Sequence, residues 1–314
     1  MAVANASRRH ANDDYREIRT RMVVLGLVQA SGEELGNTFN VWKFKYGIGK
    51  MAKNLSSKTM KVGKLDISYL TGGQGHPLVV IHGGSDGSRA WLQNANELSK
   101  HYTVYVPDLP GFGRSQPIDG DYYIPELVEF VDGFSHNLGL EGFHLMGHSL
   151  GGGIALSYAL KFPHKITKLV LVSSMCLGRE IALWVRLLSN RALCRSIGKA
   201  VLAILRGVKW VIDLLLAPLE FVIPINWTSM HLGCSVTTIK EQTTVLIHRL
   251  SEIMVPTLIV WGDKDPIIPV KQAYAAAQLI PDCQLRVFEN CGHSVYRQKT
   301  PEFSQLVTAF LSRN

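Results

Sequence analysis

Short apolar runs alternate with amphipathic segments from residue 77 almost to the end of this chain, and no other sequence feature restricts its fold as strongly. The runs have the length of strands covered on both faces, whereas the segments between them repeat apolar residues at helical spacing. Strands that alternate with helices form parallel βαβ units. The sequence therefore predicts an α/β fold with a doubly wound, mostly parallel sheet. A hairpin at 58–70 precedes apolar runs at 77–81, 102–106, 143–146, 169–172, 257–261 and 284–288.

Polar and glycine residues gather directly after the predicted strands. In open parallel sheets, ligands bind beyond the carboxyl ends of the strands. We therefore expect a functional site at that edge of the sheet. The segments that follow a predicted strand include 82–85, 108–115, 147–151, 262–265 and 292–293.

The segment Gly147-His148-Ser149-Leu150-Gly151 matches the G-x-S-x-G pattern of a nucleophile elbow. In such an elbow, a strained turn between a strand and a helix lifts the serine oxygen above the sheet. Side chains two residues to either side would clash, which explains glycine at 147 and 151. An apolar run precedes the motif and a helix-compatible segment follows it. Ser149 is therefore the candidate nucleophile.

A serine hydroxyl needs a base to take its proton. Of the eleven histidines, His293 alone combines a position after the last predicted strand, a preceding glycine and the chain order serine, acid, histidine. Asp263 and Asp265 both lie where the acid is expected. Pro266 fixes the turn after Asp265, so we favour Asp265 as the residue that orients His293, with Asp263 forming the turn.

Two backbone N–H groups are needed to bind the oxyanion of an acyl-transfer reaction. Leu150, the residue after the candidate nucleophile, is expected to supply one of them. The loop His-Gly-Gly-Ser at 82–85 is expected to supply the other from Gly84, with His82 bracing the loop.

Taken together and in this order, the motifs resemble those of the α/β-hydrolase superfamily, in the branch with a helical cap between the sixth and seventh core strands. The resemblance covers about residues 60–312 and implies a sheet of the eight-stranded type. It is specific for fold and mechanism but not for substrate. Superfamily members such as haloalkane dehalogenases and epoxide hydrolases use Asp as nucleophile, and Ser149 argues against both. The motifs are HGGS at 82–85, DLPGFGRS at 108–115, GHSLGG at 147–152, WGDKDPIIP at 261–269 and GH at 292–293.

The resemblance also implies a domain organisation. We expect a hydrolase core at 58–175 and 251–314 and a helical cap at 176–250 that roofs the active site. Residues 1–57 precede this core, and the apolar run at 22–28 predicts that they form a helical N-terminal extension. Aromatic and aliphatic side chains in the cap suit an apolar acyl or aromatic group. The residues expected to contact substrate are Ser85, His148, Trp210, Phe221 and Trp227.

The net charge of +8 is concentrated outside the predicted core. Residues 1–62 carry eleven Lys and Arg against five Asp and Glu, and residues 176–250 carry nine against four. Such charge favours an anionic membrane surface or nucleic acid. We expect no nucleic-acid partner, because the basic residues are interleaved with aliphatic ones and no nucleic-acid-binding motif occurs. Peripheral membrane contact through the cap or the N-terminus remains an alternative.

The five cysteines are odd in number, irregularly spaced and without a CxxC pair. This pattern argues against a disulfide framework or a zinc site, and we expect a reducing, cytoplasmic location. The apolar run at 22–28 is shorter than the roughly 20 residues that a membrane span needs, and acidic residues precede it.

The expected activity is hydrolysis of a hydrophobic carboxylic ester through an acyl-enzyme, without a metal or an organic cofactor. One alternative is a C–C bond hydrolase of ring-fission products, although such enzymes usually have a longer oxyanion loop than 82–85. The other is a non-catalytic ligand-binding protein on the same fold.

Overall fold

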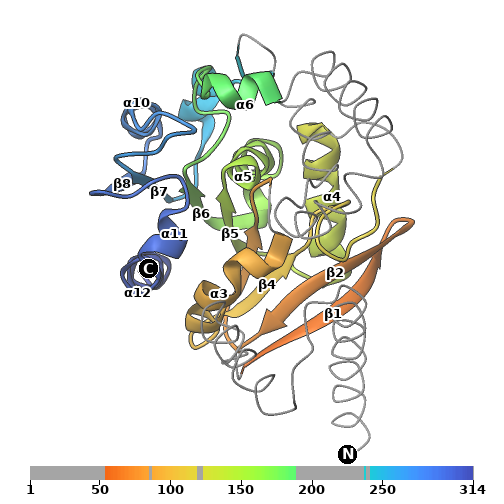
Figure 1. Ribbon diagram of the computed structural model, residues 1–314. Coiled ribbons are helices and arrows are strands. Elements are labelled where there is room, and N and C mark those ends of the chain that lie inside the picture. The colour runs from red at the N-terminus through yellow and green to blue at the C-terminus, as the bar shows by residue number, and fades with distance from the viewer. Residues whose placement is uncertain (1–53, 85–86, 119–122, 189–236, 238–240, 314) are drawn as a thin grey trace, which may run out of the picture. The chain divides into compact units, whose positions relative to one another are not determined.

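An eight-stranded sheet organises the part of the chain that the computed structural model describes, which is residues 54–84, 87–118, 123–188, 237 and 241–313 (Figure 1). These residues all belong to one unit of the chain. Residues 1–53 of the predicted extension at 1–57 and most of the predicted cap at 176–250 lie outside them, whereas residues 55–57 of that extension belong to the first strand of the sheet. The strands are β1 (Leu55–Val62), β2 (Leu65–Gly72), β3 (Pro77–Ile81), β4 (Thr103–Pro107), β5 (Phe143–His148), β6 (Ile166–Val172), β7 (Thr257–Gly262) and β8 (Cys283–Phe288).

The order of strands in the sheet is β1-β2-β4-β3-β5-β6-β7-β8. Strands β1 and β2 form an antiparallel hairpin, β2 also pairs antiparallel with β4, and all the remaining pairs are parallel. The predicted α/β fold with a mostly parallel sheet is thereby confirmed. All six residues of β5 and of β7 are buried, as expected for central strands that are covered on both faces.

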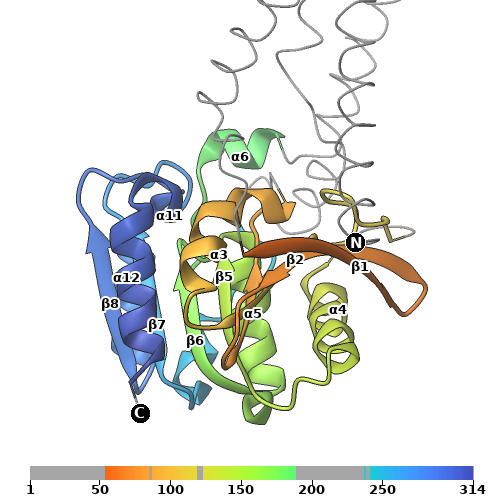
Figure 2. The same cartoon turned by 90° about the horizontal axis from the view of Figure 1, so that it is seen from below.

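Helices cover both faces of this sheet. Figure 1 shows α4, α5 and α10 on one side and α3 and α12 on the other, and α3 and α12 lie side by side in Figure 2. The strands divide their side chains between the two layers. In β3, Val79 and Ile81 join the core beneath α4 and α5, while Leu78 and Val80 join the core beneath α3 and α12. The helices are α3 (Leu92–Leu98), α4 (Ile124–Asn137), α5 (Leu150–Lys161), α6 (Leu183–Leu188), α10 (Lys271–Leu279), α11 (Val295–Gln298) and α12 (Thr300–Leu311), with short 3-10 helices η2 (Gly87–Trp91), η3 (Pro163–Lys165) and η4 (Ile247–Glu252).

The parallel register brings the carboxyl ends of four strands to one edge of the sheet. Gly147 at the end of β5 pairs with Leu171 of β6, and Gly262 at the end of β7 pairs with Phe288 of β8. The segments that follow these strands are therefore neighbours in space, although more than a hundred residues separate the first from the last. The predicted triad of Ser149, Asp265 and His293 lies on these segments.

Three further observations concern only the described part of the chain. Its cysteines, Cys176, Cys283 and Cys291, are free thiols, and burial raises the pKa of Cys176 to about 12. No cluster of three or more His, Cys, Asp or Glu side chains suited to a metal ion occurs there. None of its helices combines the length and the apolar composition that a membrane span requires.

The amino end of β5 carries a buried histidine, His144. Its Nδ1 lies 2.7 Å from Oγ1 of Thr167, and its ring packs 4.3 Å from that of His76 and 5.8 Å from that of Tyr102. Burial lowers the pKa of His144 from 6.5 to about 3, and the positive charges of His76 and Lys168 act in the same direction. The ring is therefore neutral in the folded protein at neutral pH.

We expect His144 to make the protein sensitive to acid. Because its folded pKa lies below its unfolded pKa, the unfolded chain binds the extra proton between pH 6.5 and about 3. The stabilisation is complete above pH 6.5 and is lost as the pH falls, by up to about 1.4 kcal/mol per pH unit for one group. Urea titrations between pH 7 and pH 4 should show a shallower loss of unfolding free energy for His144→Asn than for the wild type.

The control for this measurement is His136→Gln, at an exposed position near the end of α4. It should keep the pH dependence of the wild type. An unchanged pH dependence in His144→Asn would contradict the assignment.

Candidate active site

Ser149 lies at a sharp turn between β5 and α5. Its backbone has φ 53° and ψ −116°, which is a strained conformation for a residue other than glycine. Neighbouring segments hold it there: its N–H donates to the carbonyl of Val172 at 2.9 Å, and its carbonyl accepts from the N–H groups of Gly153 and Met175. The turn is therefore fixed by the end of β6 as well as by its own helix.

Two glycines make this turn sterically feasible. A Cβ atom on Gly147 would lie 2.1 Å from the carbonyl oxygen of Gly151, and one on Gly151 would lie 2.3 Å from that of Ile81. Both contacts are far shorter than any side chain allows. Helix α5 starts in direct contact with β3 and β5, and this contact is why the motif requires glycine at both positions.

The structure brings His293 and Asp265 together at the neighbouring strand ends. Nδ1 of His293 lies 2.8 Å from Oδ2 of Asp265; the Asp265 side chain is fully buried and that of His293 is 11% exposed. A carboxylate can only accept, so Nδ1 carries the hydrogen. In a neutral imidazole this leaves the lone pair on Nε2, which is the arrangement that a general base for a serine requires.

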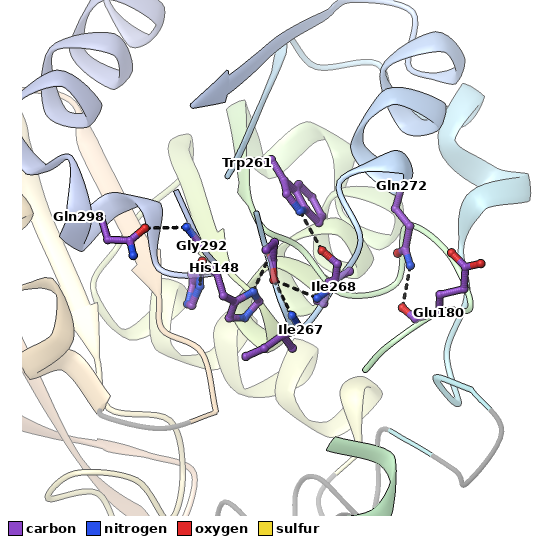
Figure 3. Close-up of polar contacts among 10 residues, drawn as sticks. His148, Glu180, Trp261, Ile267, Ile268, Gln272, Gly292 and Gln298 are labelled. Atoms are coloured by element: carbon purple, nitrogen blue, oxygen red, sulfur yellow. Dashed lines mark hydrogen bonds and ion pairs between the residues drawn. The ribbon is translucent and has the colours of Figure 1, made fainter. Parts of the chain in front are cut away.

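The second oxygen of Asp265 fixes the carboxylate. Oδ1 accepts from the backbone N–H groups of Ile267 at 2.8 Å and Ile268 at 3.0 Å. The carbonyl of Ile268 in turn accepts from Nε1 of Trp261, a buried residue of β7 (Figure 3). The carboxylate is thus held by its own turn and aimed at the loop that carries His293.

Asp263, the other acidic residue in this turn, does something different. Its Oδ1 accepts from the backbone N–H of Cys291 at 3.1 Å. It therefore ties the turn after β7 to the loop after β8 without contacting the imidazole. The hydrogen bonds thus distinguish the two acidic residues that the sequence suggested: Asp265 pairs with His293, and Asp263 does not.

The loop before α11 is held at several points. The backbone N–H of Gly292 donates to Oε1 of Gln298 at 2.8 Å (Figure 3). The carbonyl of Cys291 accepts from the N–H of Lys264, and the carbonyl of His293 lies 3.0 Å from Nε2 of His148. The position of the imidazole is therefore set by its backbone as well as by Asp265.

The loop after β3 passes next to Ser149. A Cβ on Gly83 would lie 3.3 Å from Cβ of Ser149. The buried ring of His82 braces this loop: its Nε2 accepts from the N–H of Leu109 at 2.9 Å, so its Nδ1 donates to the carbonyl of Gly83 at 2.6 Å. Gly84, one of the two expected oxyanion donors, follows directly, and the other, Leu150, is the first residue of α5.

A buried carboxylate that the sequence analysis did not single out fixes the start of η2, which follows this loop in the chain. Oδ1 of Asp108 accepts from the N–H of Ser88 at 2.6 Å, and its Oδ2 accepts from that of Arg114 at 3.1 Å. Asp108 is the first residue of the motif at 108–115 and directly follows β4. Its position after a strand is the sequence feature that could have identified it as a site residue. The roles of His148 and Gln298 had no comparable signal, because each depends on where another loop lies.

Of the five residues expected to contact substrate, four lie outside the described residues: Ser85, Trp210, Phe221 and Trp227. The fifth, His148, has a buried side chain whose Nε2 is engaged by a backbone carbonyl. This placement favours a role in holding the site together over contact with substrate.

The two ends of the predicted cap insertion are joined at the core. Oε1 of Gln242 accepts from the N–H of Cys176 at 2.8 Å, and its Nε2 donates to the carbonyl of Glu180. The same carbonyl accepts from Nε2 of Gln272, a residue of α10, at 2.7 Å (Figure 3). Entry to and exit from the insertion are thus fixed to each other and to α10.

Comparison with known proteins agrees with this architecture. A family model described as alpha/beta hydrolase fold matches residues 76–219 and 224–300. A 2-hydroxy-6-oxo-2,4-heptadienoate hydrolase of Pseudomonas putida is 30% identical, over 76% of this chain and 90% of that protein.

Two solved structures are similar over most of their length. A structure titled as a membrane phospholipase A, a bacterial virulence factor, has a TM-score of 0.63 at 25% identity, covering 92% of this chain and 97% of that one. A meta-cleavage product hydrolase from Pseudomonas fluorescens has a TM-score of 0.64 at 24% identity, covering 81% and 97%, which shows the fold alone.

Proposed function

The chain belongs to the α/β-hydrolase family, and from this premise we propose that it is a serine hydrolase that cleaves a hydrophobic carboxylic ester through an acyl-enzyme on Ser149. The observation that carries the proposal is the pairing of His293 Nδ1 with the buried carboxylate of Asp265, beyond the ends of β7 and β8 at the same edge of the sheet as the strained turn at Ser149. A histidine held in this tautomer is the base that a serine nucleophile needs.

In the proposed reaction, Nε2 of His293 takes the proton of the Ser149 hydroxyl as Oγ attacks the ester carbonyl carbon. The oxyanion is bound by the N–H groups of Gly84 and Leu150. As the intermediate collapses, the bond to the alcohol oxygen breaks and the imidazolium returns its proton to that oxygen. Water then attacks the acyl group, again losing a proton to His293. The bond between the acyl carbon and Oγ of Ser149 then breaks, the imidazolium returns its proton to Oγ, and the carboxylic acid is released.

Asp265 has two tasks in this scheme. Its carboxylate keeps the hydrogen on Nδ1 and stabilises the imidazolium in both halves of the reaction. The Asp265 side chain is fully buried, so water does not screen its negative charge. The backbone donors on its other oxygen keep the carboxylate from turning away.

The comparisons support two kinds of scissile bond. In favour of an ester, the structure titled as a phospholipase A covers 92% of this chain, and the short loop at 82–85 fits this reading. In favour of a C–C bond, the relative of 30% identity is named as a hydrolase of 2-hydroxy-6-oxo-2,4-heptadienoate, whose name describes a ring-fission type of product. C–C bond hydrolysis is therefore the second candidate.

Turnover of two substrate types separates these candidates. The purified full chain should be assayed with p-nitrophenyl esters of graded acyl length and, separately, with 2-hydroxy-6-oxo-2,4-heptadienoate. The proposal expects fast ester turnover that depends on acyl length and is lost in Ser149→Ala, with little turnover of the dienoate. A kcat/KM that is higher for the dienoate than for every ester would replace the ester proposal by the second candidate.

A further inference from the structure

The side chain of His148 lies at the junction of three segments of the site. His148 ends β5 and directly precedes Ser149. Its Nε2 lies 3.0 Å from the backbone carbonyl oxygen of His293, and the centroids of the two imidazole rings are 4.8 Å apart. A Cβ on Gly83 would lie 2.8 Å from its Nδ1. The ring of His148 therefore contacts both the loop that carries His293 and the loop after β3, and the backbone of His148 directly precedes Ser149.

The hydrogen bond to His293 defines the tautomer of the His148 ring. A carbonyl oxygen only accepts, so Nε2 of His148 carries the hydrogen. Burial holds the pKa of His148 well below 6.5, and the nearby His293, His82 and Arg297 side chains lower it further; these causes outweigh the hydrogen bond to the backbone of His293, which raises the pKa, so the ring is neutral. Its Nδ1 has no hydrogen-bonding partner among the described residues. The one hydrogen that the ring can donate is therefore committed to the backbone of His293.

Aromatic packing fixes the ring from its other side. It packs 4.8 Å from the ring of Tyr296, which follows His293 by three residues and stacks on Trp91 at 4.0 Å. The ring of Trp91 also lies 6.5 Å from that of His148. Trp91 and Tyr296 are both buried, so the imidazole of His148 cannot swing away without disrupting this cluster.

We propose that His148 is a positioning residue, which sets the distance between Ser149 and the base by holding the backbone of His293. This inference rests on the proposed function. Asp265 fixes one ring nitrogen of His293, while His148 fixes the peptide from which that ring extends. Together the two contacts determine where Nε2 of His293 points. Because His148 adjoins Ser149 in the chain, the strand end that carries the nucleophile also holds the base.

The proposal requires an effect on the chemical step and none on substrate affinity. A displacement of about 1 Å in a reacting group lowers the rate by up to 10²-fold. We expect His148→Leu, which removes the donor, to lower kcat for a p-nitrophenyl ester by about 10- to 100-fold with KM unchanged. His148→Gln places an amide donor near the position of Nε2 and should recover much of that loss.

The matched control is His144→Asn, which alters a buried histidine on the same strand far from the turn. It should reduce stability while keeping the wild-type kcat. If His148→Leu raised KM at unchanged kcat, His148 would be a substrate contact and the proposal would be overturned. The same holds if His148→Leu kept the wild-type kcat, or if His144→Asn lost as much kcat as His148→Leu.

A readout without substrate separates this inference from the proposed function. The Nδ1 proton of His293, shared with Asp265, should give a downfield proton NMR signal that is sharp in the wild type and in His148→Gln. In His148→Leu it should broaden or disappear, because the backbone of His293 is no longer held. An equally sharp signal in His148→Leu would overturn the inference whatever the substrate, whereas absence of esterase activity in the wild type would count against the proposed function alone.

Discussion

Replacing Ser149 with alanine is expected to lower kcat by about 10⁶-fold, because removal of a nucleophile leaves only binding and oxyanion stabilisation. Alanine has no atom that can attack the substrate or pass a proton to His293. It should fit the turn no worse than serine, since the strained backbone is held by bonds from the backbone of Ser149 to Val172, Gly153 and Met175. We therefore expect a folded protein with wild-type thermal stability and no ester turnover.

A serine elsewhere on the same helix provides the control. Ser157 lies two turns along α5, where its hydroxyl donates to the carbonyl of Gly153 at 2.8 Å. Ser157→Ala should keep the wild-type kcat and KM, measured under the same conditions. Substantial turnover in Ser149→Ala would show that another group is the nucleophile.

Replacing Asp265 with asparagine should lower kcat by about 10⁴-fold through the wrong tautomer of His293. The backbone N–H groups of Ile267 and Ile268 need an acceptor at the position of Oδ1, so the amide oxygen of asparagine will stay there. Its NH₂ group then faces Nδ1 of His293 and can only donate. The imidazole must accept at Nδ1, the hydrogen moves to Nε2, and Nε2 can no longer take the proton of Ser149.

The matched change at Asp263 separates this effect from simple loss of charge. Oδ1 of Asp263 accepts from the N–H of Cys291, and the amide oxygen of asparagine can accept the same bond. Asp263→Asn should therefore keep kcat at the wild-type level. Comparable losses of kcat in the two variants would mean that the local negative charge matters and the tautomer does not.

The strand positions were largely accessible from the sequence because buried parallel strands are continuous apolar runs. The run at 77–81 coincides with β3, and the run at 257–261 misses only the final residue of β7. Among the parallel strands the largest difference is in β6, which begins at Ile166 and not at Leu169. Polar side chains interrupt the run there: Thr167 contacts His144, and Nζ of Lys168 donates to carbonyls at the end of α12, including that of Leu311 at 3.0 Å.

The positions of the site residues could be predicted from the sequence for a different reason. Parallel topology places the carboxyl ends of the strands together, so Ser149, Asp265 and His293 could be assigned to one edge from their order alone. The contacts that hold the site loops in place could not be predicted from the sequence. The bonds from His148 to His293 and from Gln298 to Gly292 depend on the exact course of the loops, which no local pattern in the sequence specifies.

The central claim is that Ser149 is a nucleophile activated by His293, and covalent labelling tests it most directly. The full-length protein should be treated with a fluorophosphonate, and the adduct measured by intact mass and peptide mapping. The account predicts one adduct per chain, on Ser149, with labelling strongly slowed in His293→Ala. A wild-type protein that stays unlabelled, or carries its adduct on another residue, would contradict it.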